Sequence, residues 1–455
     1  MNRWVWPGAV VGALAAITTA AALVPAQGVP EAALTAPAAR LSLVCPAFTS
    51  VTATLRVAAV GAAGLRTAPL STPNQSAESD RLVVQSNPAE PVRVSGLLPD
   101  PFGATTVVRA AEGPDRGLSA VGCAAPRTEH WFAGVDVSAQ AQSEVVVVNL
   151  DGNPVSVDLG VHGAQGRVSA PRGVEVPGNT ARTISLGGLP RAEGPLTVAV
   201  TSSDGRVAAF LRQRTWAGEV PLGADWLPPA QAPATELVVA GIAAGEGART
   251  LVVGNPGERT ATVGVSFLTD SGPIELTGLE QLEVPAGTTR TLRLGTGLDG
   301  QAGALRLTST QPVVAGVNQD TGTARGRRDP AHATAGEPLP GDGIWPLPAG
   351  RSARTLLQLA NPAEAEATVT LISTVGGRQG QPEAVTVPPG STKTVELAAG
   401  PANVVRVQTE ATGLRAALVS TARLGDVRGL TVLPLGTDQS GPAASQVVFD
   451  AHVGS

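Results

Sequence analysis

The side chains that could ligate a metal or act as acid and base are few and far apart. The histidines are His130, His162, His332 and His452, and none has another histidine or a cysteine three to five positions away, which is the spacing of zinc sites. No pair of carboxylates is spaced as a glycosidase dyad. A Ser-His-Asp triad with distant members stays open, although no Gly-x-Ser-x-Gly turn is present. We therefore expect no metal, no cofactor and no enzymatic activity.

Two short motifs have ordinary explanations. The segment from Gly295 to Gly300 fits the Gly-x-Gly-x-x-Gly pattern of dinucleotide-binding turns, but no helical pattern follows it, as that site requires. Arg325, Arg327 and Arg328 form the one dense basic cluster. They are expected in a mobile linker, with contact to an acidic polymer or a lipid headgroup as the alternative.

The tryptophans beyond the N-terminal segment are Trp131, Trp216, Trp226 and Trp345, and the chain has no tyrosine. They stand at the starts of expected modules or between them, so we expect them to seal junctions by burying apolar area. Stacking on a sugar is the alternative. Trp226 is a possible contact residue, because the two prolines at 228 and 229 could hold it out on a linker, and an indole exposed by more than about half would make it the best candidate.

The chain has two cysteines, Cys45 and Cys123. An even pair in an exported chain predicts one disulfide. It would close a loop of about 80 residues and stabilise the fold by about 3–4.5 kcal/mol in the chain-entropy model.

The N-terminus carries a targeting signal. Arg3 precedes an uncharged apolar stretch from Trp4 to Val24, and small residues stand at the −3 and −1 positions of a cleavage after Ala26. The stretch is long enough to span a bilayer as a helix. Residues 1–26 are thus a cleaved signal peptide or an uncleaved membrane anchor, and both place the remainder outside the cytoplasm.

Composition favours an all-β chain. There are 54 Gly and 38 Pro in 455 residues, which suits many short strands and turns better than long helices. The charged fraction is 15% with a net charge of −5, against ~25% charged residues in an average protein. Nothing in this balance predicts binding to nucleic acid.

An internal repeat organises the chain. Asn149, Asn255 and Asn361 each follow an apolar strand and precede an alternating one, and they lie 106 residues apart (255 − 149 and 361 − 255). About 27 to 30 residues later each copy has a Val-Pro turn with a glycine, followed by a strand rich in threonine. Each copy has about seven strands in ~90 residues, which predicts tandem immunoglobulin-like antiparallel β-sandwiches after one N-terminal apolar helix.

The expected boundaries follow from these anchors. Pro/Gly/Ala-rich connectors at about 215–234 and 321–343 separate the copies. The predicted units after the N-terminal segment are a divergent β module at 27–127 that holds the disulfide, sandwich repeats at 128–216, 235–320 and 343–436, and a terminal strand or tail at 437–455.

The motifs resemble repeats of actinobacterial secreted surface proteins. Cys45-Pro46, Gly122-Cys123 before Trp131-Phe132, and Trp226 followed by Leu-Pro-Pro make the chain similar to an actinobacterial family of exported proteins with no assigned function. The likeness spans nearly the whole mature chain, and it implies location and fold but no activity.

The expected function is a non-enzymatic scaffold or binding protein of the cell envelope. Its partner would be an envelope polymer or protein, with the membrane as a further contact if the N-terminal helix is uncleaved. The alternatives are an accessory protein of envelope glycan assembly and a carbohydrate-acting enzyme, and a pocket holding a carboxylate pair or a triad would favour the enzyme.

Overall fold

The structure is a computed structural model of the whole chain. The described residues are 40–48, 52–60, 64–78, 82–189, 194–298, 300–322, 328–348, 353–398, 400 and 403–436. The apolar N-terminal segment, Arg325, Arg327 and the tail from 437 lie outside them. Contacts divide the chain into Met1–Ala38 and Ala39–Ser455, and only the second unit is described below. In its described part, no helix has the length and apolar character needed to cross a membrane.

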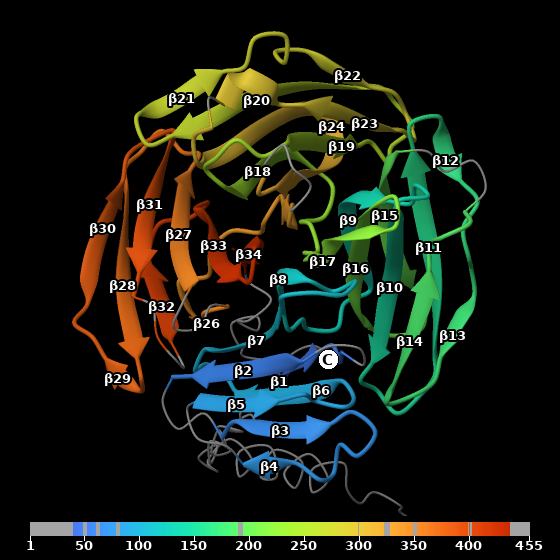
Figure 1. Cartoon of the computed structure of the whole chain (residues 1–455), viewed down its shortest axis with the longest axis vertical. Helices are drawn as coiled ribbons and strands as arrows, with labels where there is room; N and C mark the ends of the chain where they lie inside the picture. Colours follow the sequence, from blue (N-terminus) through green and yellow to red (C-terminus); the bar gives the residue numbers. More distant parts are fainter. Residues whose placement is uncertain are drawn as a thin grey trace, which may run out of the picture. The chain divides into compact units, whose positions relative to one another are not determined.

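The described chain is all-β and antiparallel, as predicted, and it forms four sandwiches (Figure 1). Sandwich N contains β1 (Arg40–Cys45), β2 (Ala53–Ala59), β3 (Arg66–Pro69), β4 (Ala77–Glu78), β5 (Leu82–Ser86), β6 (Val92–Leu97), β7 (Phe102–Ala110) and β8 (Gly117–Gly122). Sandwich 1 contains β9 (Glu129–Asp136), β10 (Ala141–Asn149), β11 (Val155–Gly163), β12 (Gly166–Val168), β13 (Val174–Val176), β14 (Thr180–Ser185), β15 (Pro195–Ser202), β16 (Ala208–Ala217) and β17 (Val220–Leu227).

The other two sandwiches follow in sequence. Sandwich 2 contains β18 (Ala234–Ile242), β19 (Arg249–Gly254), β20 (Ala261–Thr269), β21 (Gly272–Glu275), β22 (Leu282–Val284), β23 (Thr289–Arg293), the 3-10 turn η1 (Gly295–Leu298), β24 (Gly303–Asp320) and β25 (Pro330–Thr334). Sandwich 3 contains β26 (Asp342–Pro346), β27 (Ala353–Asn361), β28 (Ala367–Val375), β29 (Arg378–Gln379), β30 (Glu383–Val387), β31 (Ser391–Leu397), β32 (Val404–Thr409), β33 (Arg415–Leu424) and β34 (Val427–Leu435).

The four sandwiches share one strand order. Their inner sheets run β5-β2-β7-β8, β14-β10-β16-β17, β23-β19-β24-β25 and β31-β27-β33-β34. Their outer sheets run β1-β6-β3-β4, β9-β15-β11-β12, β18-β24-β20-β21 and β26-β32-β28-β29. The first strand of each sandwich pairs with a strand that comes late in the sequence of the same sandwich, as β9 does with β15. In an immunoglobulin constant domain the first and second strands pair, so the predicted immunoglobulin-like order is not found.

The boundaries differ from the expected ones at the connectors. Strands β9, β18 and β26 begin at Glu129, Ala234 and Asp342, within two residues of the expected starts. The segments 215–234 and 321–343, however, contain β17 and β25. Their small residues suit strands packed closely around an axis, and composition alone made them resemble linkers.

Three asparagines fix equivalent turns. In Asn149, Asn255 and Asn361, Nδ2 donates to the carbonyl oxygen four residues later at 2.7, 2.7 and 2.8 Å. Each Oδ1 accepts from the backbone N–H two residues later at 2.9, 3.0 and 3.1 Å. Each Nδ2 also donates to a valine carbonyl across the sandwich, on Val176, Val284 and Val387 respectively. Because all three side chains are buried, these bonds satisfy turn groups that water cannot reach.

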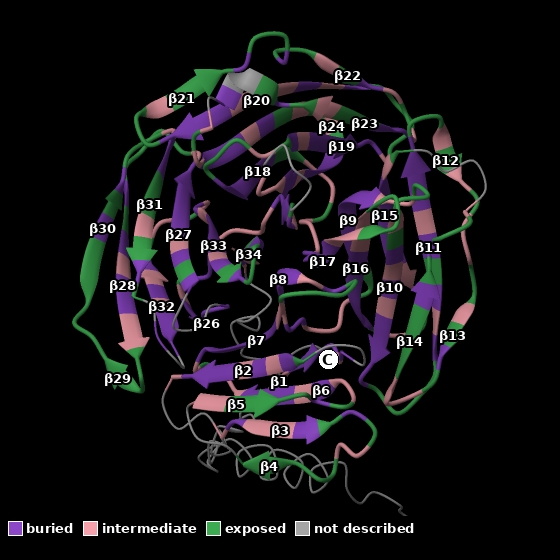
Figure 2. Ribbon diagram, in the orientation of Figure 1, coloured by how far each residue is buried: buried purple, intermediate pink, exposed green. Residues whose placement is uncertain are grey.

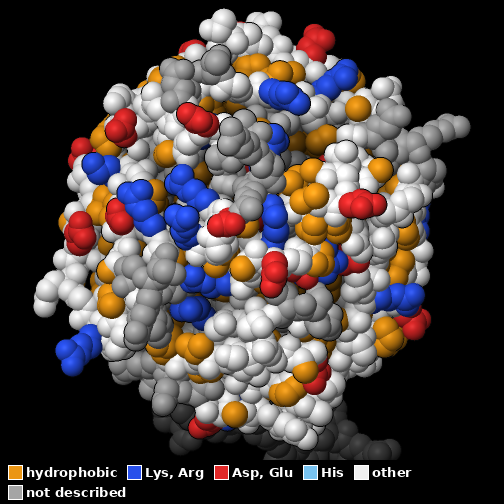
Figure 3. All heavy atoms as spheres, viewed as in Figure 1, with side chains coloured by type: hydrophobic (Ala, Val, Ile, Leu, Met, Phe, Trp, Pro, Cys, Tyr) orange, Lys and Arg blue, Asp and Glu red, His pale blue; other side chains and the backbone are white. Residues whose placement is uncertain are grey.

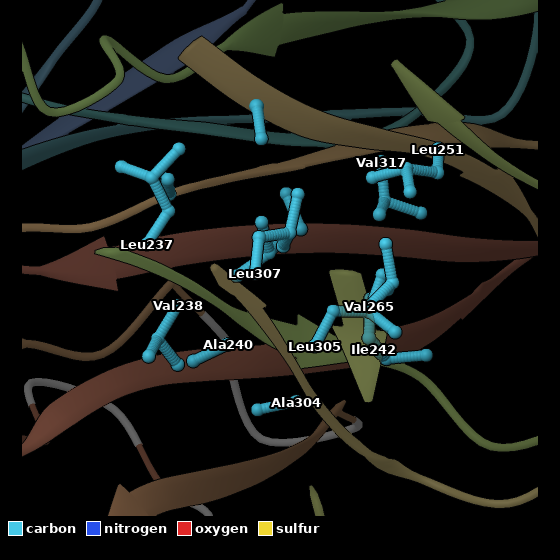
Figure 4. Packing of buried hydrophobic residues seen from close by; sticks show 14 of the residues in the cluster. Leu237, Val238, Ala240, Ile242, Leu251, Val265, Ala304, Leu305, Leu307 and Val317 are labelled. Atoms are coloured by element: carbon cyan, nitrogen blue, oxygen red, sulfur yellow. The ribbon is translucent and has the colours of Figure 1, made fainter. Parts of the chain in front are cut away.

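The sandwiches close into a ring within this unit. Apolar clusters join sandwich N to sandwich 1, 1 to 2, 2 to 3, and 3 back to N. Buried residues concentrate toward the middle, whereas the outer strand β29 is exposed and β30 is exposed except at Val385 and Val387 (Figure 2). Figure 4 shows the cluster of sandwich 2, which continues onto Ala417 and Val432 of sandwich 3.

Strand β10 shows how the sequence encodes this closure. Val145 and Val147 enter the core of sandwich 1, whereas Val148 packs against sandwich N. The run of valines is apolar on both faces because both faces are covered. Residues 155–161 of strand β11 alternate and have one covered face, since Val155, Val157 and Leu159 are buried with exposed or partly exposed residues between them.

Candidate functional site on the ring axis

The innermost strands of the four sandwiches, β8, β17, β25 and β34, surround the ring axis. Each is the last strand of its sandwich and lies at the edge of its inner sheet. Each contacts two of the others, in the cyclic order β8, β17, β25, β34. Edge strands expose unpaired backbone groups that invite aggregation, and the ring covers these four.

Asp329 fills the middle of the axis. It precedes β25, has 0% exposure, and its Oδ2 accepts from Leu118 N at 3.0 Å and from Leu430 N at 2.7 Å. A Cβ atom at Gly117 or Gly223 would come within 1.8 or 2.8 Å of its Oδ1. Both glycines have φ between +110° and +145°, a conformation that side chains disfavour. One carboxyl thus ties sandwiches N, 2 and 3 together.

Asp225 of β17 is a second axial carboxyl with 0% exposure. Its Oδ1 accepts a hydrogen bond from the Thr431 hydroxyl at 3.2 Å, and Ser119 donates to the same carboxyl. Thr431 Oγ1 in turn accepts from Ala120 N at 3.0 Å. Asp225 Oδ2 and Asp329 Oδ1 have no hydrogen-bond partner among the described residues.

Burial decides the protonation of this pair. It raises the pKa of Asp225 well above the usual range, and the nearby Asp329 carboxyl raises it further. Burial likewise raises the pKa of Asp329 well above its usual range, and the two backbone N–H donors only partly offset it. The pair favours the uncharged forms and is sealed from solvent, which suits a structural role better than acid–base catalysis of an external substrate.

A pocket opens where the innermost strands end. This axial pocket is lined by residues 120–124, Arg127, 129–131, Trp226, 228–232, 336–337 and 433–436, and its cavity volume is about 100 Å³. All four sandwiches, or the segments that leave them, contribute. Small and apolar residues make up most of the wall, and its charged groups are Arg127, Glu337 and Glu129, the last at the start of β9.

An ion pair crosses the mouth of the axial pocket. Arg127 donates from both terminal nitrogens to Glu337, at 2.6 and 3.2 Å. Arg415 donates to Gly336 O at 2.7 Å and lies 3.5 Å from Oε1 of Gln231. Burial lowers the pKa of Arg415, and Glu337 opposes the shift. A fork-to-fork pair between distant segments fixes the shape of the pocket.

The axial tryptophan is not exposed. Trp226 belongs to β17 instead of a linker, has 2% exposure, and packs edge-on to Phe48 and Phe210 at 5.3 and 6.1 Å. It seals the junction of sandwiches N and 1 and also lines the axial pocket. Trp131 seals the junction of sandwiches 1 and 2, whereas Trp345 fills the core of its own sandwich.

Of the remaining predicted residues, Cys123 alone lines the axial pocket. Cys45 and Cys123 form the predicted disulfide, with 4.4 Å between their Cα atoms. Arg328 is half-exposed and lies 3.7 Å from Asp320. The first four residues of the Gly-x-Gly-x-x-Gly segment form η1, and the next element is strand β24 instead of an α-helix.

His452 lies outside the described residues, and the three described histidines are buried separately. Burial lowers the pKa of His130 to about 4, and its Nε2 donates to Val207 O at 2.7 Å. His162 stacks on Trp131 with centroids 6.3 Å apart. In the described part of the chain, no three His, Cys, Asp or Glu side chains gather as a metal site. Figure 3 shows Lys and Arg side chains gathered near the middle of the viewed face, with a few Asp and Glu side chains among them.

Sequence reasoning missed the acid pair, although the repeat period could have aligned it. Gly117, Gly223 and Asp329 are 106 residues apart (223 − 117 and 329 − 223), as are Ser119 and Asp225 (225 − 119). The asparagine anchors have the same period. Extending that period into the supposed linkers would have placed these residues at one level of the ring.

The sequence matches DUF5719, described as a family of unknown function, over residues 99–398. The match runs from just before β7 to the end of β31. It confirms that the chain belongs to a family without an assigned function, and it carries no statement on organism, export or repeated modules. No protein with a curated description matches the chain.

Proposed function

The chain belongs to DUF5719, a family of unknown function, and from the ring that this member forms we propose that it is a non-enzymatic binding protein or scaffold of the cell envelope. The observation that carries the proposal is the axial pocket. Four sandwiches close around one axis, and the segments leaving them line one cavity bridged by Arg127 and Glu337. Rigid scaffolds commonly present such preformed sites to ligands.

The sandwiches are copies of one module in this proposal. Their common strand order and the matching hydrogen bonds of Asn149, Asn255 and Asn361 support it. Sandwich N is the divergent copy, since Asn87 accepts a bond from Ala53 N across a strand pair instead. Joining copies into a ring buries the edge that each copy would expose alone.

Export from the cytoplasm is the second part of the proposal. The Cys45–Cys123 disulfide has both sulfur-bearing residues buried in the core of sandwich N, and disulfides persist in oxidising compartments. The apolar stretch from Trp4 to Val24 supplies the signal or anchor, as in the actinobacterial exported proteins that the chain resembles. The intact mass of the protein from cells tests this: loss of residues 1–26 indicates secretion, and their retention indicates anchoring.

The glycan-hydrolysing alternative receives less support. It requires a carboxylate pair in an open pocket, with the carboxyls separated to fit an acid and a nucleophile or base. The axial pair, Asp225 and Asp329, has 0% exposure, and neither residue lines the axial pocket.

Capture from envelope fractions tests the binding function. Gln231→Trp fills the small axial pocket from its wall, whereas Val84→Trp adds the same bulk at a side chain that is 51% exposed. We expect one polymer or protein to be retained by the wild type and by Val84→Trp, and to be lost by Gln231→Trp. The proposal would be contradicted if the wild type were recovered without any bound polymer or protein, or if all three proteins retained the same amount of it.

A further inference from the structure

A second pocket lies on sandwich 3, where the hairpin of β33 and β34 turns. Its lining residues include Arg354, Arg423, Asp426 and Arg428, and its cavity volume is about 450 Å³, within the ~300–1,000 Å³ range of small-molecule sites. We name it the Arg423 pocket. Arg428 stands at the start of β34, and Leu433 near its end lines the axial pocket, about 17 Å away at ~3.3 Å per residue (433 − 428). The two pockets are therefore separate.

Three arginines of this pocket share one face of the inner sheet. Arg354 of β27 stands opposite Thr421 of β33, and Arg423 of β33 stands opposite Arg428 of β34. Residues that stand opposite each other share a face of a sheet, as do residues two positions apart along a strand. Because all three arginines are exposed, their guanidinium groups are accessible to a ligand from solvent.

Arg423 and Arg428 form an unfavourable cross-strand pair, since like charges directly opposite each other on a sheet repel. Arg423 donates from Nε to Gly425 O at 3.4 Å. The Arg428 side chain makes no hydrogen bond or ion pair with the described part of the chain. Asp426, in the turn between them, is the one carboxylate among the described lining residues. The pocket therefore has a surplus of positive charge that an anion would offset.

The third arginine, Arg354, has a partner that a ligand can displace. Its Nη2 donates to Glu396 Oε2 at 2.8 Å, and the two side chains are 59% and 58% exposed. Ion pairs that are this exposed stabilise a fold very little. Exchanging the glutamate for a ligand oxygen therefore costs little stability, and it lets the pocket present three guanidinium groups to one ligand.

Three guanidinium groups favour a phosphate over a carboxylate. The planar fork of arginine pairs with either anion. A phosphate monoester has a charge of about −1.5 to −2 and three acceptor oxygens, so it accepts from several arginines at once better than a singly charged carboxylate does. We propose that the Arg423 pocket binds a phosphate group, held by the guanidinium groups of Arg354, Arg423 and Arg428. The site goes beyond the function proposed for the axial pocket and does not depend on it.

Isothermal titration calorimetry of the full chain with pyrophosphate tests the proposal. We expect binding that weakens when salt is added, because salt screens exposed charges. Arg423→Gln and Arg428→Gln should each weaken the affinity about tenfold, as expected for the loss of one hydrogen bond to a charged group. Glu396→Gln removes the competitor for Arg354 and should tighten binding about twofold. Arg378→Gln, at an exposed arginine of β29 in the same sandwich, is the matched control and should leave the affinity unchanged.

Two polymers distinguish the source and the chemistry of the anion. Poly(glycerol phosphate) presents phosphate groups along a chain, and polygalacturonate presents carboxylates. Binding of pyrophosphate without the phosphate polymer assigns the pocket to a small phosphate compound, whereas binding of the phosphate polymer assigns it to a polymer-borne phosphate. The proposal is overturned if neither phosphate ligand binds, if Arg423→Gln and Arg428→Gln bind like the wild type, if Arg378→Gln loses as much affinity as they do, or if polygalacturonate binds as tightly as the phosphate ligands.

Discussion

Replacing Asp225 by asparagine should change how the stability of the ring depends on pH. The carboxyl has 0% exposure, and burial and Asp329 raise its pKa well above the ordinary 3.8. Above pH 3.8 the unfolded chain releases this proton while the folded chain keeps it. The folded state then binds more protons, so this group's contribution to stability falls as pH rises, until the folded pKa is reached.

The magnitude follows from linkage. Each pH unit between the unfolded and folded pKa values removes about 1.4 kcal/mol per carboxyl. Asparagine keeps an oxygen for Thr431 but puts an unpartnered N–H₂ where Oδ2 stood. That adds a constant cost of about 1–3 kcal/mol. The prediction therefore concerns the slope of the stability difference against pH, not its sign at one pH.

The assay is urea unfolding of both proteins between pH 4.5 and 8. The wild-type curve alone is composite, because burial lowers the pKa of His130 to about 4 and that of His332 to about 3. Those histidines stabilise the fold increasingly as pH rises toward 6.5, the opposite direction. The difference between the unfolding free energies of the two proteins no longer contains the contribution of the histidines. We expect the free energy of unfolding of Asp225→Asn to increase relative to that of the wild type as pH rises.

An exposed carboxyl provides the control. Asp204→Asn, in a turn of sandwich 1, should give a stability difference that is flat over the same range. A flat difference for Asp225→Asn as well, or one that falls with pH, would refute the argument that the axial carboxyl is held uncharged by burial.

Three further predictions concern stability. Asn149→Ala leaves two carbonyl groups and one N–H of its turn without partners, and it should cost about 2–5 kcal/mol in denaturant unfolding. The double change Cys45→Ala and Cys123→Ala removes a bond between residues 78 positions apart, and it should cost about 3–4.5 kcal/mol. Trp226→Ala empties the junction of sandwiches N and 1 and should cost about 3–5 kcal/mol, seen as a lower Tm.

Each of these predictions has a matched control. Asn153→Ala changes an exposed side chain in the same turn and should leave the free energy of unfolding nearly unchanged. Reduction of the wild type should reproduce the cysteine variant. Trp216→Ala, at a half-buried ring, should lower Tm far less than Trp226→Ala. Equal effects of either substitution and its control would show that burial is not the cause, and a wild type unaffected by reduction would contradict the disulfide prediction.

Local features of the chain could be predicted from sequence because their causes are local. Alternating residues in β11 and β28 and the asparagine turns specify strands and their ends, since strand periodicity and turn hydrogen bonds involve near neighbours. The two cysteines could be paired because no other cysteine competes. The asparagine period also located the starts of β9, β18 and β26 to within two residues.

The ring, its strand order and its axis were decided only by tertiary structure. Short segments rich in alanine, glycine and proline look alike whether they link domains or line a crowded centre, so β17 and β25 could not be told from linkers. Asp225 and Asp329 lie 104 residues apart (329 − 225) and look like ordinary turn acids in sequence. Their protonation depends on burial, and burial exists only once four sandwiches exclude water from one axis.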